Sequence, residues 1–174
     1  MVIWITGISG AGKSTIATAI IDKYKTVLPN LINIDGDVVR NLYGNDLGYE
    51  EKDRIIQIKR LQKLCIFLES QKQIIIASAL YSNPSLMEWN KNNFSDYFEI
   101  YLKVSLDLVK KRDPKGMYKK YNLGEEKNIV GIDVPWHEPV NSDLVVNMND
   151  KKSVSEIVEL ITQNILLFKN AELI

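Results

Sequence analysis

Reactive side chains that often reveal a function are scarce in this sequence, whose 174 residues include one cysteine and one histidine. One cysteine excludes a disulfide framework within the chain, and Cys65 falls among leucines at helical spacing, where a small buried thiol is commoner than a nucleophile. No apolar run approaches the length that spans a bilayer, and residues 1–6 lack the basic segment and longer apolar stretch of a signal peptide. We therefore expect a cytoplasmic protein without a membrane partner.

The sequence also lacks an excess of either charge, because 22 lysines and arginines balance 22 aspartates and glutamates. A chain without net charge has no global field that attracts polyanions, so we expect no nucleic-acid partner and only local anion binding. The length suits one domain, residues 1–174, with one active site. The oligomeric state stays open between a monomer and a homodimer.

Short apolar strands alternate with helical patterns along the chain. We predict strands at residues 2–6, 31–34, 74–77, 98–104 and 144–146, and a long amphipathic helix at 54–69. Units of strand, helix and strand make right-handed crossovers, which give a parallel sheet covered by helices on both faces. The expected fold class is therefore α/β, a three-layer α/β/α sandwich with a mainly parallel five-stranded sheet.

Two segments near the end of the chain need separate interpretation. Residues 113–141 are rich in Lys, Gly, Pro and Tyr and have no sustained hydrophobic period. Long irregular segments often cover substrates, so we predict a mobile lid there, with a poorly ordered surface insertion as the alternative. Residues 153–168 are predicted to form one last helix, which begins at a capping box of Ser153 and Glu156.

Residues 7–14, Gly-Ile-Ser-Gly-Ala-Gly-Lys-Ser, match the complete GxxxxGK[ST] pattern of a P-loop between a predicted strand and a predicted helix. The glycines let backbone N–H groups curl around phosphate oxygens, and the helix adds the positive end of its dipole. We predict that Lys13 bridges the β- and γ-phosphates and that the Ser14 hydroxyl binds Mg²⁺. The predicted nucleotide-binding residues of this P-loop NTPase fold are Gly7, Ser9, Gly10, Ala11, Gly12, Lys13, Ser14 and Thr15.

Two carboxylates, Asp35 and Asp37, flank a glycine directly after the second predicted strand. The carboxyl ends of strands collect around the ligand crevice of such a sheet, so both side chains are expected to face the transferred phosphate. We assign Asp35 to the Mg²⁺ shell and Asp37 to the acceptor hydroxyl, which together with Lys13 makes the predicted catalytic set. The alternative is a simple turn in which an aspartate caps the next helix.

A P-loop also occurs in GTPases, motor ATPases and nucleotide-dependent switch or assembly proteins, and the switch or assembly class is the alternative function. The guanine signature NKxD is absent from the sequence, whereas the acidic pair is followed by arginines at 40 and 54 and by a basic lid. Arginine forks suit phosphate or sulfate oxygens better than a lysine does. These features favour an ATP-dependent kinase of a small nucleotide acceptor.

Ordered motifs along nearly the whole chain resemble the adenylylsulfate kinase family, whose members phosphorylate the ribose 3'-hydroxyl of adenylyl sulfate with ATP and Mg²⁺. The motifs are the P-loop at 7–14, Asp-Gly-Asp at 35–37 with Arg40, Asn-Asp-Leu-Gly-Tyr at 45–49, Asp-Arg at 53–54, Arg-Asp-Pro-Lys-Gly at 112–116 with Tyr-Lys-Lys at 118–120, and Gly-Ile-Asp at 131–133. The resemblance implies a catalytic Asp37, acceptor contacts from Arg40 and Arg54, a lid that carries Lys115 and Lys119, and Arg112 near the ATP adenine.

The sequence departs from this family at the acceptor side. The family stacks the acceptor adenine between two phenylalanines, where this chain offers Tyr49 and Ile129, and Gln57 replaces an expected asparagine. The family's Ile-Ser-Pro-x-Arg segment becomes Leu-Tyr-Ser-Asn-Pro at 80–84, without its arginine and with Tyr81 at the serine position. Losing one aromatic face of a base stack worth about 1–3 kcal/mol shifts acceptor preference by tenfold or more.

The region from 78 to 90 also resembles kinase-like proteins associated with bacterial surface-polysaccharide nucleotides, such as cytidine diphosphoramidate kinase. That resemblance implies an acceptor with a ribose 3'-hydroxyl, a tetrahedral anionic tail and a pyrimidine. Adenylyl sulfate and cytidine diphosphoramidate therefore stay open as acceptors. Trp136 is open between a lid contact and a loop anchor, and the single histidine, His137, is expected to be a loop residue without a catalytic part.

Overall fold

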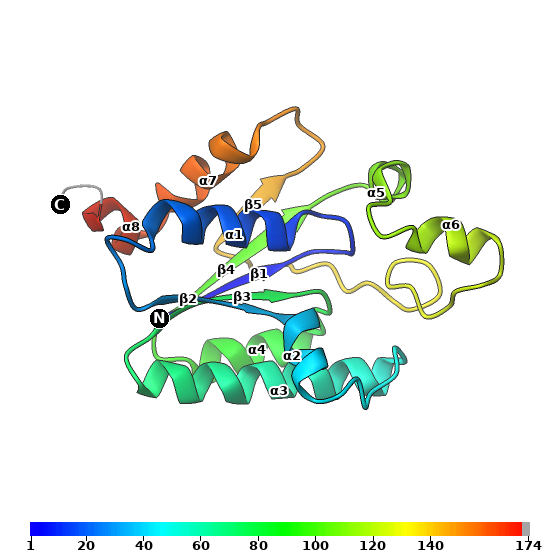
Figure 1. The fold of residues 1–174 in the computed structure, drawn as a ribbon, viewed down its shortest axis with the longest axis horizontal. Helices are drawn as coiled ribbons and strands as arrows, with labels where there is room; N and C mark the ends of the chain where they lie inside the picture. Colours follow the sequence, from blue (N-terminus) through cyan, green and yellow to red (C-terminus); the bar gives the residue numbers. More distant parts are fainter. Residues whose placement is uncertain (172–174) are drawn as a thin grey trace.

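Five parallel strands form the centre of the computed structural model, which describes residues 1–171 (Figure 1). The strands lie in the order β2-β3-β1-β4-β5, and each neighbouring pair is parallel. Their bounds are β1 Val2–Thr6, β2 Leu31–Asp35, β3 Ile74–Ala79, β4 Tyr97–Lys103 and β5 Leu144–Asn147. The predicted α/β fold with a five-stranded parallel sheet is confirmed.

Helices cover both faces of the sheet (Figure 1). One face carries α1 (Lys13–Tyr24), α7 (Val154–Thr162) and α8 (Leu166–Ala171). The other face carries α2 (Gly36–Leu42), α3 (Glu51–Ser70) and α4 (Pro84–Asn93). The short helices α5 (Leu106–Arg112) and α6 (Met117–Asn122) lie beyond the end of the sheet, so the three layers leave that edge open to a ligand.

Strand β1 divides the core into two halves by the alternation of its side chains. Ile3 and Ile5 belong to the apolar cluster under α1 and α7, whereas Val2 and Trp4 belong to the cluster under α3 and α4. All four side chains are inaccessible to solvent, as a central strand buried on both faces requires. The first strand is therefore fixed in position on both sides, and the loop that follows it starts from a rigid point.

The predicted last helix at 153–168 is wrong in one respect, because the structure has two helices there. Helix α7 begins at the predicted capping box but ends at Thr162, and α8 begins at Leu166. Asn164 explains the break, since its side-chain amide donates to the carbonyl of Leu160 at 2.8 Å. Its backbone N–H turns to the carbonyl of Ile161, which is tighter than α-helical spacing.

The predicted lid, residues 113–141, is more regular than the sequence suggests. It contains α6, whose first turn is capped by Asp113, and Tyr118 from this helix is buried with its hydroxyl donating to the carbonyl of Ser9 at 3.2 Å. The rest of the segment is irregular apart from a bridge between Val130 and Val134. The predicted lid is thus anchored to the loop that follows β1.

The register of the sheet places three strand ends side by side. Thr6 at the end of β1 is level with Ala79 of β3 and with Tyr101 of β4, and Asp35 at the end of β2 is level with Ser78. The loops after β1, β2 and β3 therefore leave the sheet at one edge, where a ligand crevice is expected. Within residues 1–171, no helix combines the length and the hydrophobicity needed to cross a membrane.

Candidate active site

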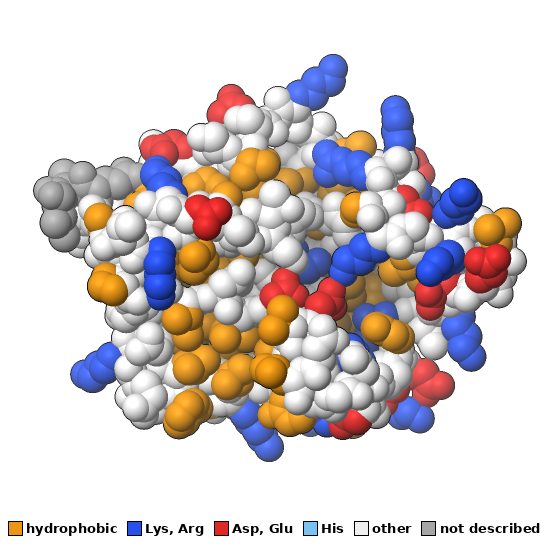
Figure 2. Space-filling model, in the orientation of Figure 1, with side chains coloured by type: hydrophobic (Ala, Val, Ile, Leu, Met, Phe, Trp, Pro, Cys, Tyr) orange, Lys and Arg blue, Asp and Glu red, His pale blue; other side chains and the backbone are white. Residues whose placement is uncertain are grey.

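A cavity of about 830 Å³ opens at the carboxyl edge of the sheet. Figure 2 shows its mouth as a hollow with acidic and basic side chains at the rim. The cavity brings together most of the predicted site residues, namely Ser9, Gly10, Gly12, Lys13, Ser14, Thr15, Asp35, Asp37, Arg40, Tyr49, Arg54, Gln57, Arg112, Lys115 and Ile129. Residues separated by more than 100 positions in the sequence thus share one site.

Two predicted P-loop residues do not line the cavity. Ala11 is completely buried, and Gly7 lies against the backbone of β4, where an added Cβ would sit 2.8 Å from the carbonyl oxygen of Leu102. Both residues shape the turn, whereas Gly10 and Gly12 reach the cavity wall. Gly10 and Gly12 have φ values of 81° and 97°, which favour glycine and aim successive N–H groups in the manner of an anion nest.

Lys13 opens helix α1 directly after this turn, at the positive end of the helix dipole. Its ammonium donates to the carbonyl oxygens of Gly7 at 2.7 Å and Ile8 at 3.1 Å. Burial lowers the pKa of Lys13 from 10.5 to about 8, although Asp37 and Asp35 nearby oppose that shift. The loop thus holds a cation in a desolvated position, which a polyphosphate anion would stabilise.

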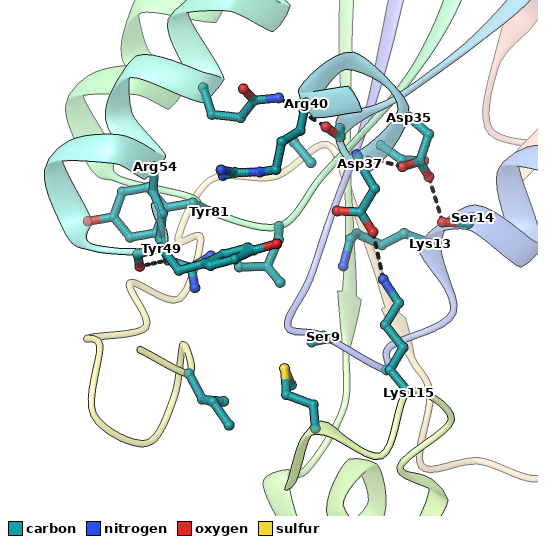
Figure 3. Close-up of a pocket in the computed structure, with 18 of the residues that line it drawn as sticks. Ser9, Lys13, Ser14, Asp35, Asp37, Arg40, Tyr49, Arg54, Tyr81 and Lys115 are labelled. Atoms are coloured by element: carbon teal, nitrogen blue, oxygen red, sulfur yellow. Dashed lines mark hydrogen bonds and ion pairs between the residues drawn. The ribbon is translucent and has the colours of Figure 1, made fainter. Parts of the chain in front are cut away.

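The two halves of the site meet at Ser14 and Asp35. The Ser14 hydroxyl donates to Oδ2 of Asp35 at 2.6 Å (Figure 3), while Oδ1 of Asp35 accepts from the backbone N–H of Asp37 at 2.8 Å and so caps α2. The capping interpretation of the Asp-Gly-Asp turn is therefore confirmed for Asp35, and it coexists with a position in the cavity.

A hydroxyl and a carboxylate are the hard oxygen donors that Mg²⁺ prefers, so Ser14 and Asp35 fit the expected ion. No group of three His, Cys, Asp or Glu side chains among residues 1–171 could hold a metal by itself. An Mg²⁺ ion at Ser14 would then take its other ligands from phosphate oxygens and water, as is usual in sites of this kind.

Asp37 lies near Lys13 in the cavity and forms an ion pair with Lys115 at 2.6 Å (Figure 3). Both side chains are exposed, Asp37 by 70% and Lys115 by 64%. The hydrogen bond from Lys115 to Asp37 raises the pKa of the lysine, which therefore stays charged. An exposed pair of this kind is weak enough to separate when a charged ligand enters.

Arg40 and Arg54 line the cavity as predicted, but several of their donors bind backbone carbonyls. Arg40 is buried and its Nη1 donates to Leu47 and Gly48, both at 2.9 Å, while Arg54 Nε donates to Tyr49 at 2.9 Å. The two guanidinium groups also lie 4.6 Å and 5.6 Å from the centre of the Tyr49 ring, which extends between them in Figure 3. The arginines hold the loop at residues 47–49 in place and also offer positive charge to the cavity.

The remaining predicted residues take up supporting positions. Gln57 is buried, and its side-chain amide donates to the carbonyl of Gly36 at 2.9 Å, which positions the start of α2. Arg112 lines the cavity and donates to the carbonyl of Met148 at 3.3 Å. Lys119, which was predicted to lie over the nucleotides, does not line the cavity, whereas its neighbour Lys120 does.

Several residues of the cavity wall were not predicted from the sequence, and Tyr81 is the largest of them. Its ring lines the cavity, its hydroxyl donates to Glu51, and burial raises its pKa to about 12. The departure of the 80–84 segment from the family pattern was the signal that marked it. Ser82 is buried and its hydroxyl donates to the carbonyl of His137 at 2.6 Å.

His137 and Trp136 do not line the main cavity. Nε2 of His137 lies 4.0 Å from a carboxylate oxygen of Glu51, and the ring of Trp136 packs 6.1 Å from that of Tyr101. A smaller hollow behind the P-loop includes Trp136. Trp136 therefore acts as a loop anchor in this structure.

The crevice combines a glycine-rich anion nest, a helix N-terminus, a lysine and two carboxylates. This combination is typical of P-loop kinases. A family model described as adenylylsulphate kinase matches residues 1–147. The chain therefore belongs to the adenylylsulphate kinase family.

Individual relatives cover nearly the whole chain. Cytidine diphosphoramidate kinase of Campylobacter jejuni is 33% identical over 166 residues, which are 95% of this chain and 96% of that protein. A probable adenylyl-sulfate kinase of Bacillus subtilis is 34% identical over 163 residues, 92% of this chain and 81% of that protein. Among solved structures, the APS kinase of Mycobacterium tuberculosis in complex with AMPPNP and APS has a TM-score of 0.84 at 27% sequence identity. The match covers 94% of this chain and 95% of the Mycobacterium tuberculosis chain.

The close approach of Gly7 to β4 generates a stability prediction. Gly7→Ala should lower the free energy of unfolding by about 1–3 kcal/mol, because a Cβ would meet the Leu102 carbonyl and φ is 154°. Gly124→Ala is the control, since its φ of 73° is also unfavourable but nothing lies within 4 Å of the added Cβ. Chemical denaturation of both variants measures the difference, and equal losses would contradict the proposed clash.

The lowered pKa of Lys13 predicts a pH dependence of nucleotide binding. Below about pH 8 the free protein carries the charged ammonium, and above it the charge is lost. Because phosphates favour the charged form, ATP affinity should fall by roughly tenfold per pH unit as the pH rises above 8. Calorimetry from pH 7 to 9.5 measures this, and Lys13→Arg, which does not titrate there, should flatten the profile. An unchanged affinity in the unsubstituted protein would contradict it.

Proposed function

We propose that this protein transfers the γ-phosphoryl group of ATP to the ribose 3'-hydroxyl of a small nucleotide that carries a tetrahedral anionic tail. The observation that carries the proposal is the convergence of Lys13, Ser14, Asp35 and Asp37 on one cavity. ATP enters as the donor because the P-loop nest and Lys13 match its β- and γ-phosphates. Ser14 and Asp35 would hold Mg²⁺, which supplies charge neutralisation on the phosphates.

Asp37 is the group that orients the acceptor hydroxyl in this proposal. It belongs to the same cavity as Lys13 and contributes to the field around that ammonium. A carboxylate there can accept the hydroxyl proton as the oxygen attacks phosphorus in line with the leaving ADP. Lys115, now paired with Asp37, would pass to the phosphates when the two substrates fill the cavity.

The first acceptor candidate is cytidine diphosphoramidate. Two residues of the cavity are proposed to flank the base, the aromatic Tyr49 and the aliphatic Ile129. This pair suits a pyrimidine better than a purine sandwiched between two rings. The similarity to the Campylobacter jejuni enzyme over 95% of this chain supports the same choice. With this acceptor, the protein described here would supply nucleotides for a surface polysaccharide.

The second candidate is adenylyl sulfate. The matched family model and the structural similarity to an APS kinase bound to APS favour it. Both acceptors present a 3'-hydroxyl and an anionic tail, so Asp37 and Arg40 would serve either one. The walls around the base, rather than the catalytic groups, would make the choice.

An acceptor assay tests the proposal directly. ATP turnover with Mg²⁺ is measured with each candidate acceptor and with its 3'-deoxy analogue, and the product is identified as the 3'-phosphorylated nucleotide. We expect strong stimulation by one or both acceptors and none by the 3'-deoxy compounds. Turnover that ignores every acceptor would support a switch or assembly protein instead.

Asp37→Asn isolates the hydroxyl-orienting role. The amide keeps the shape of the side chain but cannot take a proton, so kcat for phosphoryl transfer should fall by roughly 10²–10⁴-fold. The dissociation constant for ATP should change little, because the P-loop is intact. Near-normal transfer in this variant would remove Asp37 from the proposed mechanism.

Ile129→Phe tests the base preference. The variant gives the acceptor site a second aromatic wall, so the ratio of kcat/KM for adenylyl sulfate to that for cytidine diphosphoramidate should rise by about tenfold. Ile129→Leu is the matched control, since it changes the side chain without adding a ring. An equal ratio in the Phe and Leu variants would contradict a stacking role for this wall.

A further inference from the structure

A compact loop, residues 128–134, contributes Asn128 and Ile129 to the wall of the cavity that Tyr49 also lines. The carbonyl of Ile129 accepts from the N–H groups of Ile132 at 3.0 Å, Asp133 at 3.2 Å and Val134 at 3.1 Å, and Gly131 donates back to Val134 at 2.8 Å. Only 2% of Ile129 is exposed, although its side chain reaches the cavity. The loop is therefore closed on itself and presents one apolar side chain to a ligand.

The carboxylate of Asp133 completes this loop. It accepts from the N–H of Asn128 at 2.7 Å and from the N–H of Ile129 at 2.5 Å. Asn128 has a φ of 63°, an uncommon conformation for a side-chain-bearing residue, and the carboxylate bonds on either side of its peptide stabilise it. Asp133 itself does not line the cavity.

Arg54 joins this loop to the backbone of Tyr49. Its Nη2 donates to the carbonyl of Asn128 at 2.6 Å, and its Nε donates to the carbonyl of Tyr49 at 2.9 Å. One buried guanidinium thus binds the backbone next to Ile129 and the backbone of Tyr49 at the same time. Because the guanidinium fork is planar and rigid, it fixes the separation of these two backbone segments.

We propose that Asp133 and Arg54 are positioning residues that set the width of the acceptor-base site between Tyr49 and Ile129. This inference rests on the proposed function, because it assumes that a nucleotide base enters between these walls. Asp133 acts through the loop and without touching the acceptor. We call the hydrogen bonds that Arg54 and Asp133 make with these backbone segments the brace. The brace selects for the thickness and the placement of the base, whereas the P-loop side of the cavity does not depend on it.

Asp133→Asn is the decisive variant, because it keeps the shape of the side chain and weakens two charge-assisted hydrogen bonds. We expect KM for the nucleotide acceptor to rise by roughly five- to tenfold with kcat and the KM for ATP nearly unchanged. An abasic acceptor, with hydrogen in place of the base, should bind equally to both proteins. Asp22→Asn on the exposed surface of α1 is the control and should change nothing.

A conservative change at the second residue tests the brace from its other end. Arg54→Lys keeps the charge but cannot reach both carbonyls with a planar fork, so it should give the same pattern of base-dependent loss. If Arg54 served only to bind the anionic tail, the abasic acceptor would lose as much affinity as the nucleotide. That outcome, or a uniform rise of both KM values in Asp133→Asn, would overturn the inference.

Hydrogen exchange and calorimetry test the brace without a measurement of turnover. In Asp133→Asn, the amides of Asn128 and Ile129 should exchange at least several-fold faster while those of β1 stay protected. Acceptor binding should weaken only when the base is present. Unstimulated turnover in the unsubstituted protein would contradict the proposed function, whereas unchanged exchange at these two amides would contradict the brace itself.

Discussion

The parallel register of β1, β2 and β3 is the constraint on which the site depends. It brings Thr6, Asp35 and Ala79 to the same edge, so the loops that follow them leave the sheet together. The hydrogen bond between Ser14 and Asp35 then joins the phosphate loop to the acidic turn. A shift of one residue in this register would turn these side chains to the opposite face and separate the two halves of the site.

The two ends of the cavity are built by different means. At the P-loop end, backbone conformation shapes the site. Gly10 and Gly12, at φ values of 81° and 97°, and the start of α1 direct N–H groups toward the position expected for phosphate. At the end proposed to bind the acceptor, side chains hold irregular loops: Arg40 and Arg54 bind carbonyls, and Asp133 binds N–H groups. The first device is common to many nucleotide-binding proteins, whereas the second can vary with the acceptor.

Much of the fold and of the phosphate end could be predicted because the signals are local in sequence. Five apolar strands and one complete P-loop pattern are each contained in a few adjacent residues, and the structure has them at nearly the predicted bounds. The break between α7 and α8 could not be predicted, since it depends on which way the Asn164 side chain turns. Helix α6 has six residues, too few for a hydrophobic period, and is held by Asp113.

The hydrogen-bond partners of the residues predicted to bind the acceptor could not be predicted from the sequence. Arg54 and Asn128 are 74 positions apart, and their hydrogen bond follows from the folded path of the lid. The approach of Tyr81 to the cavity depends in the same way on the turn after β3. The resemblance to the family predicts an acceptor contact for Arg54, and the structure adds that this side chain holds two loops together.

Direct transfer between two nucleotides in one crevice is the central claim of this account. Ser82, which neighbours the serine position of the family pattern, is buried and donates to the His137 carbonyl, so it is poorly placed to carry a covalent phosphoryl group. The stereochemical course with ATP made chiral at the γ-phosphorus by oxygen isotopes tests this most directly. A single in-line transfer predicts inversion of configuration at phosphorus in the 3'-phosphorylated product. Retention would require two transfers through a phosphorylated protein and would contradict the account.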